Sequence, residues 1–313
     1  MKITKKYEGP KYDAHIHLTT VEKIQEMLRY IEEFNIQKAV GIVWEHRKEE
    51  IEEHFPDQFT LARFLPLREL ASRDYDFVLN WIDQTYEQEY VMLKFWLGPR
   101  WRDYAEREFK LKNLNITLDD PDLDPIFERM EDYNFIFLVH VSDPDLFYDK
   151  RYQPVSRYGR KEEHLKELEN VLVKHPKLRV QGAHFASQPE HLDNLSRWLD
   201  RFPNLSIDTA SARWMTREFG RQRKRAKEFF ERYQDRILFG SDVMSGRNDL
   251  DPIPNYYIDR YHTFQALFET SIEGQPLPFP DDENNNETKI FGLDLPVKIL
   301  KKIYWENSRK LYG

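Results

Sequence analysis

The sequence of 313 residues contains no cysteine. Disulfide bonds and thiolate metal sites are therefore excluded, and any bound metal must be held by His, Asp or Glu side chains. Long apolar runs are also missing, so the sequence predicts no membrane-spanning segment and no membrane partner. The first six residues lack the apolar core of a secretion signal. These absences together predict a cytoplasmic protein.

Basic charge is not in excess either. The formal net charge is −8, whereas a nucleic-acid partner favours a basic patch. We therefore expect no nucleic-acid partner, and we interpret the densest basic run, residues 221–227, as one solvated helix face. The remaining composition, 40% hydrophobic and 14% aromatic, is that of a globular protein with a sizeable core.

Short apolar runs alternate with amphipathic helical segments along the whole chain. The runs are rich in Val, Ile, Leu and Phe, as expected for strands that are buried on both faces. Strands that alternate with helices pair in parallel, and eight such units favour a closed barrel over an open sheet. We therefore predict an α/β protein whose residues 1–313 form one domain, a single (β/α)8 TIM barrel. The eight predicted strands are residues 12–18, 38–44, 59–65, 90–97, 135–142, 179–186, 205–209 and 237–243.

Three connections between these elements are long. They are residues 98–124 after strand four, 143–160 after strand five and 244–296 after strand eight. All three leave the C-terminal ends of strands, where barrel enzymes place their active sites. Within the last of them, segment 276–288 is rich in Asp and Asn, and we expect it to be a solvated excursion without a chemical role.

Polar residues interrupt four of the apolar strands near their C-terminal ends. His15 and His17 are two residues apart on strand one and share a face. His140 ends strand five, His184 ends strand six and Asp242 ends strand eight. Alone, each has an ordinary alternative, such as a packed core histidine or a carboxylate that caps a turn. In a closed barrel, however, these strand ends converge.

The converging residues predict a metal centre. Two histidines on one face, a third histidine and a carboxylate together form a ligand set typical of Zn²⁺, and also of Mn²⁺, Fe²⁺ or Co²⁺. We therefore expect one divalent metal, with Zn²⁺ as the first choice, and no organic cofactor. The predicted ligands are His15, His17, His140 and Asp242.

These residues resemble the pattern of the amidohydrolase superfamily of metal-dependent barrels. Segments 236–242 and 303–313 are similar to the strand-eight signature and the C-terminal tail of its amidohydrolase-related branch. That branch includes aminocarboxymuconate-semialdehyde decarboxylase, resorcylate-type decarboxylases and lactone hydrolases. The resemblance covers essentially the whole chain and is specific for the fold and the site, but not for the substrate.

The resemblance also implies roles for two residues. His184 would stand beside the metal-bound water and orient or deprotonate it, and Asp242 would in addition shuttle the proton. The underlying chemistry is general, because a bound metal lowers the pKa of its water towards about 7 and polarises a carbonyl. Members of the family are often dimers, so a homodimer is expected by analogy alone.

Lys94 lies among apolar residues on strand four. In dinuclear members of the superfamily a strand-four lysine is carboxylated and bridges two metals. We favour an unmodified Lys94 that contacts an anionic substrate or a carboxylate, since a buried lysine without such a partner is costly.

Cationic and aromatic residues near the same strand ends predict a small, carboxylated and cyclic substrate. Arginine clamps carboxylates through paired hydrogen bonds, and tryptophan packs on rings. For each residue singly, surface solvation or core packing is the alternative. The predicted contacts besides Lys94 are Arg63, Arg100, Arg213, Trp44 and Trp96.

Three functions follow from these predictions. The first is a metal-dependent hydrolase that attacks an amide, lactone or ester carbonyl with metal-activated water. The second is a metal-dependent non-oxidative decarboxylase, because the ligand set is shared. The third is a catalytically silent barrel that binds a ligand; its signature would be a missing metal ligand, and all four predicted ligands are present in the sequence.

Overall fold

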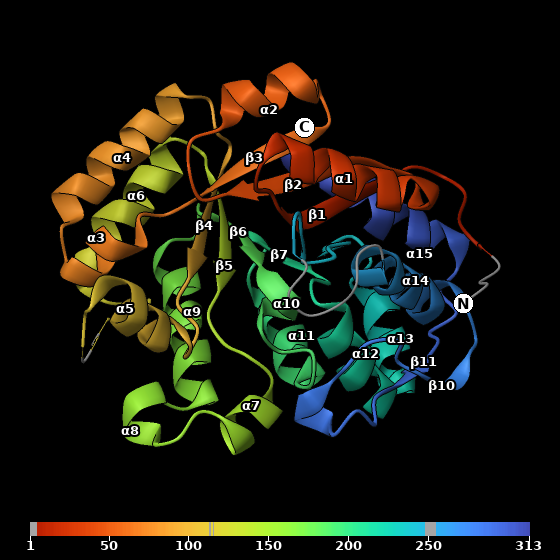
Figure 1. Ribbon diagram of the computed structural model, residues 1–313. Helices are drawn as coiled ribbons and strands as arrows, with labels where there is room; N and C mark the ends of the chain where they lie inside the picture. The colour runs from red at the N-terminus through yellow and green to blue at the C-terminus, as the bar shows by residue number, and fades with distance from the viewer. Residues whose placement is uncertain (1–4, 113, 115, 248–254) are drawn as a thin grey trace.

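The computed structural model describes residues 5–112, 114, 116–247 and 255–313. The strands lie near the middle of the molecule with helices arranged around them (Figure 1). The strands are β1 (Lys11–His17), β2 (Ile36–Val43), β3 (Phe59–Phe64), β4 (Met92–Trp96), β5 (Ile136–His140), β6 (Arg179–Gly182), β7 (Leu205–Asp208), β8 (Ile237–Leu238), β9 (Val243–Met244), β10 (Glu273–Pro276) and β11 (Lys289–Phe291).

The main sheet is parallel and has the order β8-β7-β6-β5-β4-β3-β2-β1-β9. Its two end strands are consecutive in the chain, because β8 and β9 are the halves of one interrupted strand. The Ala14 amide donates to the Phe239 carbonyl over 2.6 Å, and the Asp242 amide donates to the His15 carbonyl over 2.8 Å. These bonds join the interrupted strand to β1, so the sheet closes and the predicted (β/α)8 barrel is confirmed.

Helices follow most of the barrel strands. Those of the first half are α1 (Val21–Ile31), η1 (Glu32–Phe34), α2 (Lys48–His54), α3 (Leu67–Ser72), α4 (Tyr75–Glu87), α5 (Trp101–Phe109), η2 (Pro121–Leu123), α6 (Asp124–Asp132), α7 (Asp145–Lys150) and α8 (Val155–Tyr158). Those of the second half are α9 (Lys161–Lys174), α10 (Ala183–Ala186), α11 (Leu192–Arg201), α12 (Ala212–Arg221), α13 (Arg223–Arg232), α14 (Asn255–Glu269), η3 (Asp282–Asn284), α15 (Val297–Lys301), η4 (Lys302–Glu306) and α16 (Asn307–Tyr312). Among the described residues, no helix combines the length and apolar character that a membrane span requires.

The amphipathic pattern explains how the helices pack. In α1 the buried residues are Val21, Ile24, Met27 and Ile31, which recur at three- and four-residue intervals and so form one stripe against the barrel. In β5 four buried apolar residues precede His140, so the strand is held in the interior and its polar end emerges at the top of the barrel.

Two predicted strands differ from the structure by more than two residues at their C-terminal ends. Strand six ends at Gly182, and His184 lies in the short turn α10 rather than on the strand. Strand eight is interrupted between Leu238 and Val243, and Asp242 has a left-handed φ of 61° within the interruption. In both places the backbone departs from the extended form just where it carries a polar side chain of the site.

Segment 276–288 is only in part the solvated excursion that the sequence predicted, because several of its residues are exposed whereas others are buried. Its Asp281 is buried, and both of its carboxylate oxygens accept from Nη1 of the buried Arg217, at 2.8 and 3.0 Å. Its Glu283 is also buried and pairs with Arg151. These two buried acidic residues therefore bind an arginine of α12 and an arginine at the end of α7, and the segment forms part of the cavity wall above the barrel.

Candidate metal centre

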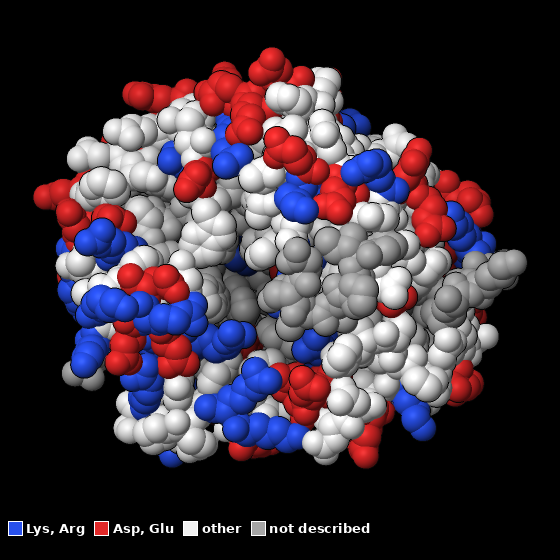
Figure 2. All heavy atoms as spheres, viewed as in Figure 1, with Lys and Arg blue, Asp and Glu red and all other residues white. Residues whose placement is uncertain are grey.

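A cavity of about 630 Å³ lies at the C-terminal ends of the barrel strands. It is lined by residues from most of the strands together with the long connections after strands four, five and eight. Figure 2 shows a hollow near the middle of the viewed face, with Lys and Arg side chains gathered along its lower rim. The cavity is thus on the face where barrel enzymes place their chemistry.

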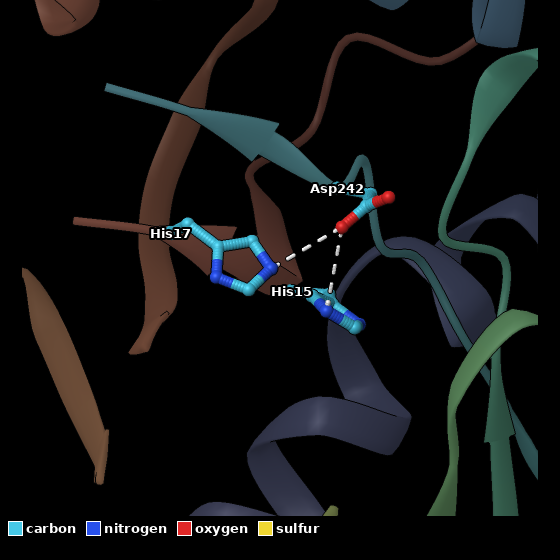
Figure 3. Close-up of side chains that lie close together, drawn as sticks. All are labelled: His15, His17 and Asp242. Atoms are coloured by element: carbon cyan, nitrogen blue, oxygen red, sulfur yellow. Dashed lines mark ion pairs between the residues drawn. The ribbon is translucent and has the colours of Figure 1, made fainter. Parts of the chain in front are cut away.

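His15, His17 and Asp242 converge at the base of this cavity (Figure 3). Asp242 Oδ1 lies 3.3 Å from His17 Nε2 and 3.5 Å from His15 Nε2. The three candidate ligand atoms are all within 4.8 Å of one another. Two imidazole nitrogens and a carboxylate oxygen in this arrangement fit a divalent cation.

The hydrogen bonding of His15 supports this fit. Its Nε2 is buried and, among the described residues, has no hydrogen-bond partner. Buried polar atoms are normally satisfied, so an orphaned nitrogen beside a carboxylate fits the role of a metal ligand. Burial alone would raise the pKa of Asp242, but its hydrogen bond to His17 and the nearby histidines hold that pKa below the usual range. The carboxylate is therefore ionised at neutral pH.

His140, the fourth predicted ligand, lies in the same cavity but outside this cluster. Its Nε2 is 3.0 Å from Asp143 Oδ1, and the Tyr152 hydroxyl donates to the other oxygen of Asp143. Its ring centroid is 4.5 Å from that of His184. The structure thus gathers three of the four predicted ligands and holds the fourth beside them, and metal binding by all four stays a prediction.

His184 faces the cluster from α10. Its ring centroid lies 5.4 Å from that of His15, and its Nδ1 is 3.1 Å from the Ala210 carbonyl oxygen. Because a carbonyl only accepts, Nδ1 carries the proton and Nε2 keeps its lone pair. Burial and, to a smaller extent, repulsion from His140 lower the pKa of His184 to about 3. The ring is therefore neutral and able to accept a hydrogen bond from water.

Lys94 reaches the cavity from β4 and is buried. Burial lowers the pKa of its ammonium group to about 8, an effect that the negative charges of Asp208 and Asp242 partly oppose. Within the described part of the chain, its Nζ makes no hydrogen bond. Lys94 therefore offers a largely protonated, unpartnered amine at the base of the cavity.

The other predicted substrate contacts divide into two groups. Trp44, Trp96, Arg100 and Arg213 line the cavity. Arg63 does not: its guanidinium donates to Thr85 and Gln88 and lies 4.5 Å from the Trp81 ring. Side chains alternate along a strand, and Phe64 faces the cavity, so its neighbour Arg63 faces helix α4. The predicted substrate contact of Arg63 is therefore wrong.

Sequence reasoning missed two residues that shape the site. Asp143 and Asp208 are buried carboxylates that bind site histidines. Trp214, one of the aromatic residues expected at the barrel mouth, lies with its ring centroid 4.9 Å from that of His184. Asp143 follows His140 by three residues and Asp208 ends an apolar strand. Applying the rule of polar residues at strand ends to strand seven as well would have found Asp208.

Comparisons with known proteins agree with the barrel fold. The sequence profile of the amidohydrolase family matches residues 96–313, whereas no curated protein matches the chain. A 2,6-dihydroxybenzoate decarboxylase, solved with 2,6-dihydroxybenzoate, is similar in structure with a TM-score of 0.54 and 14% identity, over 98% of each chain. A Staphylococcus aureus protein described as an amidohydrolase has a TM-score of 0.56 and 12% identity, over 97% of this chain and 100% of that one. At these identities the structural matches show the shared fold, and the profile match to most of the sequence shows that the chain belongs to the amidohydrolase family.

Proposed function

We propose that the protein is a metal-dependent hydrolase that cleaves an amide, lactone or ester bond of a small, carboxylated substrate. The observation that carries this proposal is the convergence of His15, His17 and Asp242 below a cavity large enough for a small molecule. When bound, a divalent metal would lower the pKa of a water molecule and polarise the substrate carbonyl. His15, His17 and Asp242 would hold it, with His140 as the proposed fourth ligand.

The chain's own residues would orient the reactants and move the proton. The lone pair on His184 Nε2 can accept a hydrogen bond from a water molecule and aim that water at the carbonyl. In hydrolysis the water oxygen bonds to the carbonyl carbon, the bond to the leaving nitrogen or oxygen breaks, and the water's proton passes to the leaving group. Asp242, ionised and adjacent, would carry that proton.

The residues that line the cavity favour an anionic, ring-shaped substrate. Lys94 supplies a positive charge at the base, and Arg100 lies nearer the mouth. The rings of Trp44 and Phe64 are stacked at a centroid distance of 3.8 Å and present a flat apolar wall. A carboxylate would pair with Lys94 while a ring packs on this wall.

Non-oxidative decarboxylation is the second candidate function. It is supported by the similarity in fold to a decarboxylase that binds 2,6-dihydroxybenzoate and by the aromatic walls of the cavity. In this reaction the bond between the ring carbon and the carboxyl carbon breaks, the electron pair stays on the ring carbon, and that carbon takes up a proton.

Isotope labelling separates the two reactions. Purified protein loaded with Zn²⁺ or Mn²⁺ would be incubated with a panel of aromatic acids, lactones and amides in H₂¹⁸O or in D₂O. Hydrolysis places one ¹⁸O in the acid product, whereas decarboxylation releases CO₂ and places one deuterium on the ring carbon. We expect ¹⁸O incorporation; CO₂ release with deuterated product would establish the lyase instead.

Three variants test the assigned roles. His15→Ala and Asp242→Ala should lose the metal and the activity together, as measured by elemental analysis and turnover. His184→Ala should keep the metal and lose turnover by about 100- to 10,000-fold, the usual contribution of acid–base groups. Full activity in a metal-free His15→Ala protein would refute the assignment.

A further inference from the structure

One buried carboxylate on β7 contacts two of the site histidines. Asp208 has no solvent exposure. Its Oδ2 lies 3.0 Å from His15 Nδ1 and accepts from Gln181 Nε2 over 2.7 Å. Its Oδ1 accepts from the backbone amides of His184, over 2.9 Å, and Ala210, over 3.1 Å. Both oxygens are therefore occupied by donors that belong to, or flank, the candidate metal centre.

The contact with Asp208 determines which nitrogen of His15 carries the proton. An ionised carboxylate only accepts hydrogen bonds, so His15 Nδ1 must donate. A ring that binds a metal must then do so through the lone pair on Nε2, the nitrogen that lies 3.5 Å from Asp242 Oδ1 in the ligand cluster. A second hydrogen bond of this kind is how proteins set the tautomer and ring orientation of a metal-ligating histidine.

The contact with the His184 amide holds an unusual stretch of backbone. Residues 184–187 all have left-handed φ angles, of 55°, 57°, 48° and 62°, and none of them is glycine. Such a conformation persists only where its surroundings determine it. Asp208 Oδ1 accepts from the first amide of this turn, and the same oxygen binds the amide of Ala210, whose carbonyl faces His184 Nδ1. Asp208 thus holds the His184 backbone directly and the His184 ring through Ala210.

We propose that Asp208 is the positioning residue of the metal centre, a single carboxylate that sets the tautomer of His15 and the placement of His184. The proposal rests on the proposed function for its metal, but the tautomer that it assigns to His15 is a property of the metal-free protein. It predicts that metal affinity and the orientation of His184 depend on the same side chain.

The test begins with Asp208→Asn, which keeps the size of the side chain and replaces one acceptor by a donor. An asparagine cannot accept from both His15 Nδ1 and the His184 amide, so at least one of these contacts must fail. We expect the affinity for Zn²⁺ or Mn²⁺, measured by isothermal titration calorimetry, to fall by about 10- to 100-fold, as is usual when a partner of a metal-ligating histidine is removed.

Glu269→Gln is the matched control. Glu269 is also a buried carboxylate, but it binds the Tyr304 hydroxyl over 3.0 Å and pairs with Lys11 at the start of β1. Removing its charge should lower the melting temperature without changing metal affinity. A loss of affinity in both variants would mean that general destabilisation is responsible, and would overturn the positioning role.

Nitrogen-15 NMR of the histidine rings in metal-free wild-type protein gives a second readout that needs no variant to fold. We expect His15 Nδ1 to carry a proton that it donates to Asp208. An Nδ1 without a proton, or unchanged metal affinity in a folded Asp208→Asn protein, would overturn the proposal. If wild-type protein binds none of the tested divalent metals, the proposed function fails, and the His15 tautomer still decides the role of Asp208.

Discussion

At the scale of single residues, the charge of Lys94 has opposite effects on the stability of the protein and on substrate binding. Its ammonium group lies in the barrel interior, and burial lowers its pKa from 10.5 to about 8. A lowered lysine pKa means that the folded protein binds the proton less tightly than the unfolded chain does, so the charge costs stability below about pH 8. The same buried charge would attract a carboxylate that enters the cavity. The charge therefore lowers the stability of the protein but strengthens substrate binding.

Lys94→Met should therefore stabilise the metal-free protein while weakening the binding of its substrate. At pH 7 the free energy of unfolding should rise by up to about 3 kcal/mol, since each pKa unit corresponds to about 1.4 kcal/mol. The gain should shrink as the pH rises from about 8 to 10.5, where the unfolded chain also loses the proton. Urea unfolding at several pH values measures this difference.

The KM for a carboxylated substrate should rise by about 10- to 100-fold in Lys94→Met, the loss expected for one charged hydrogen bond. Lys94→Arg keeps the charge and serves as the comparison. Equal KM values in wild type and Lys94→Met, or a stability gain that grows above pH 8, would contradict the role assigned to Lys94.

At the scale of elements, the left-handed turn of residues 184–187 depends on Gly182. A Cβ atom at position 182 would lie 2.6 Å from the Ala186 Cβ and 2.9 Å from the Ala186 Cα. Each left-handed residue other than glycine costs about 1–2 kcal/mol. The turn that places His184 therefore stores strain and requires that no side chain be present at Gly182.

Gly182→Ala should displace this turn and reduce turnover more than metal content. We expect a loss of stability of about 1–3 kcal/mol, typical of overpacking, together with a lower kcat. Ala186→Gly removes the closest contact and a left-handed alanine, so the Gly182→Ala/Ala186→Gly double variant should recover part of both losses. Denaturant unfolding and steady-state kinetics of the three proteins test this, and additive losses in the double variant would count against it.

At the scale of the whole molecule, the metal centre exists only when the barrel is closed. His15 and His17 are on β1, whereas Asp242 lies between β8 and β9, more than two hundred residues later in the sequence. The unfolded chain does not bring these groups together, so a bound cation should stabilise the folded state by mass action.

Chelation should accordingly lower the melting temperature of the wild-type protein. With metal at a hundred times its dissociation constant, the stabilisation is about 2.7 kcal/mol, which for a protein of this size corresponds to about 5 °C. His15→Ala should melt at the same temperature with and without EDTA. Differential scanning calorimetry measures both, and an equal shift in the two proteins would place the stabilising ion elsewhere.

The sequence by itself determined the barrel and most of the candidate site, because both depend on short-range periodicity. Alternation along a strand puts His15 and His17 on one face, and a polar residue that ends an apolar strand marks His140 and Asp242 without reference to the rest of the chain. The same alternation along β3 turns the side chain of Arg63 away from the cavity, because the next residue on that strand faces into it.

The tertiary structure alone decided the partners of these residues. The contact between His15 and Asp208 joins residues 193 positions apart, and the acidic segment 276–288 is held at the cavity in part by the pair between buried Arg217 and its Asp281. The left-handed turn at His184 likewise has no local signal, since its strain is offset by contacts across the barrel. Local patterns specify which face a side chain occupies, whereas barrel closure specifies which distant group it meets.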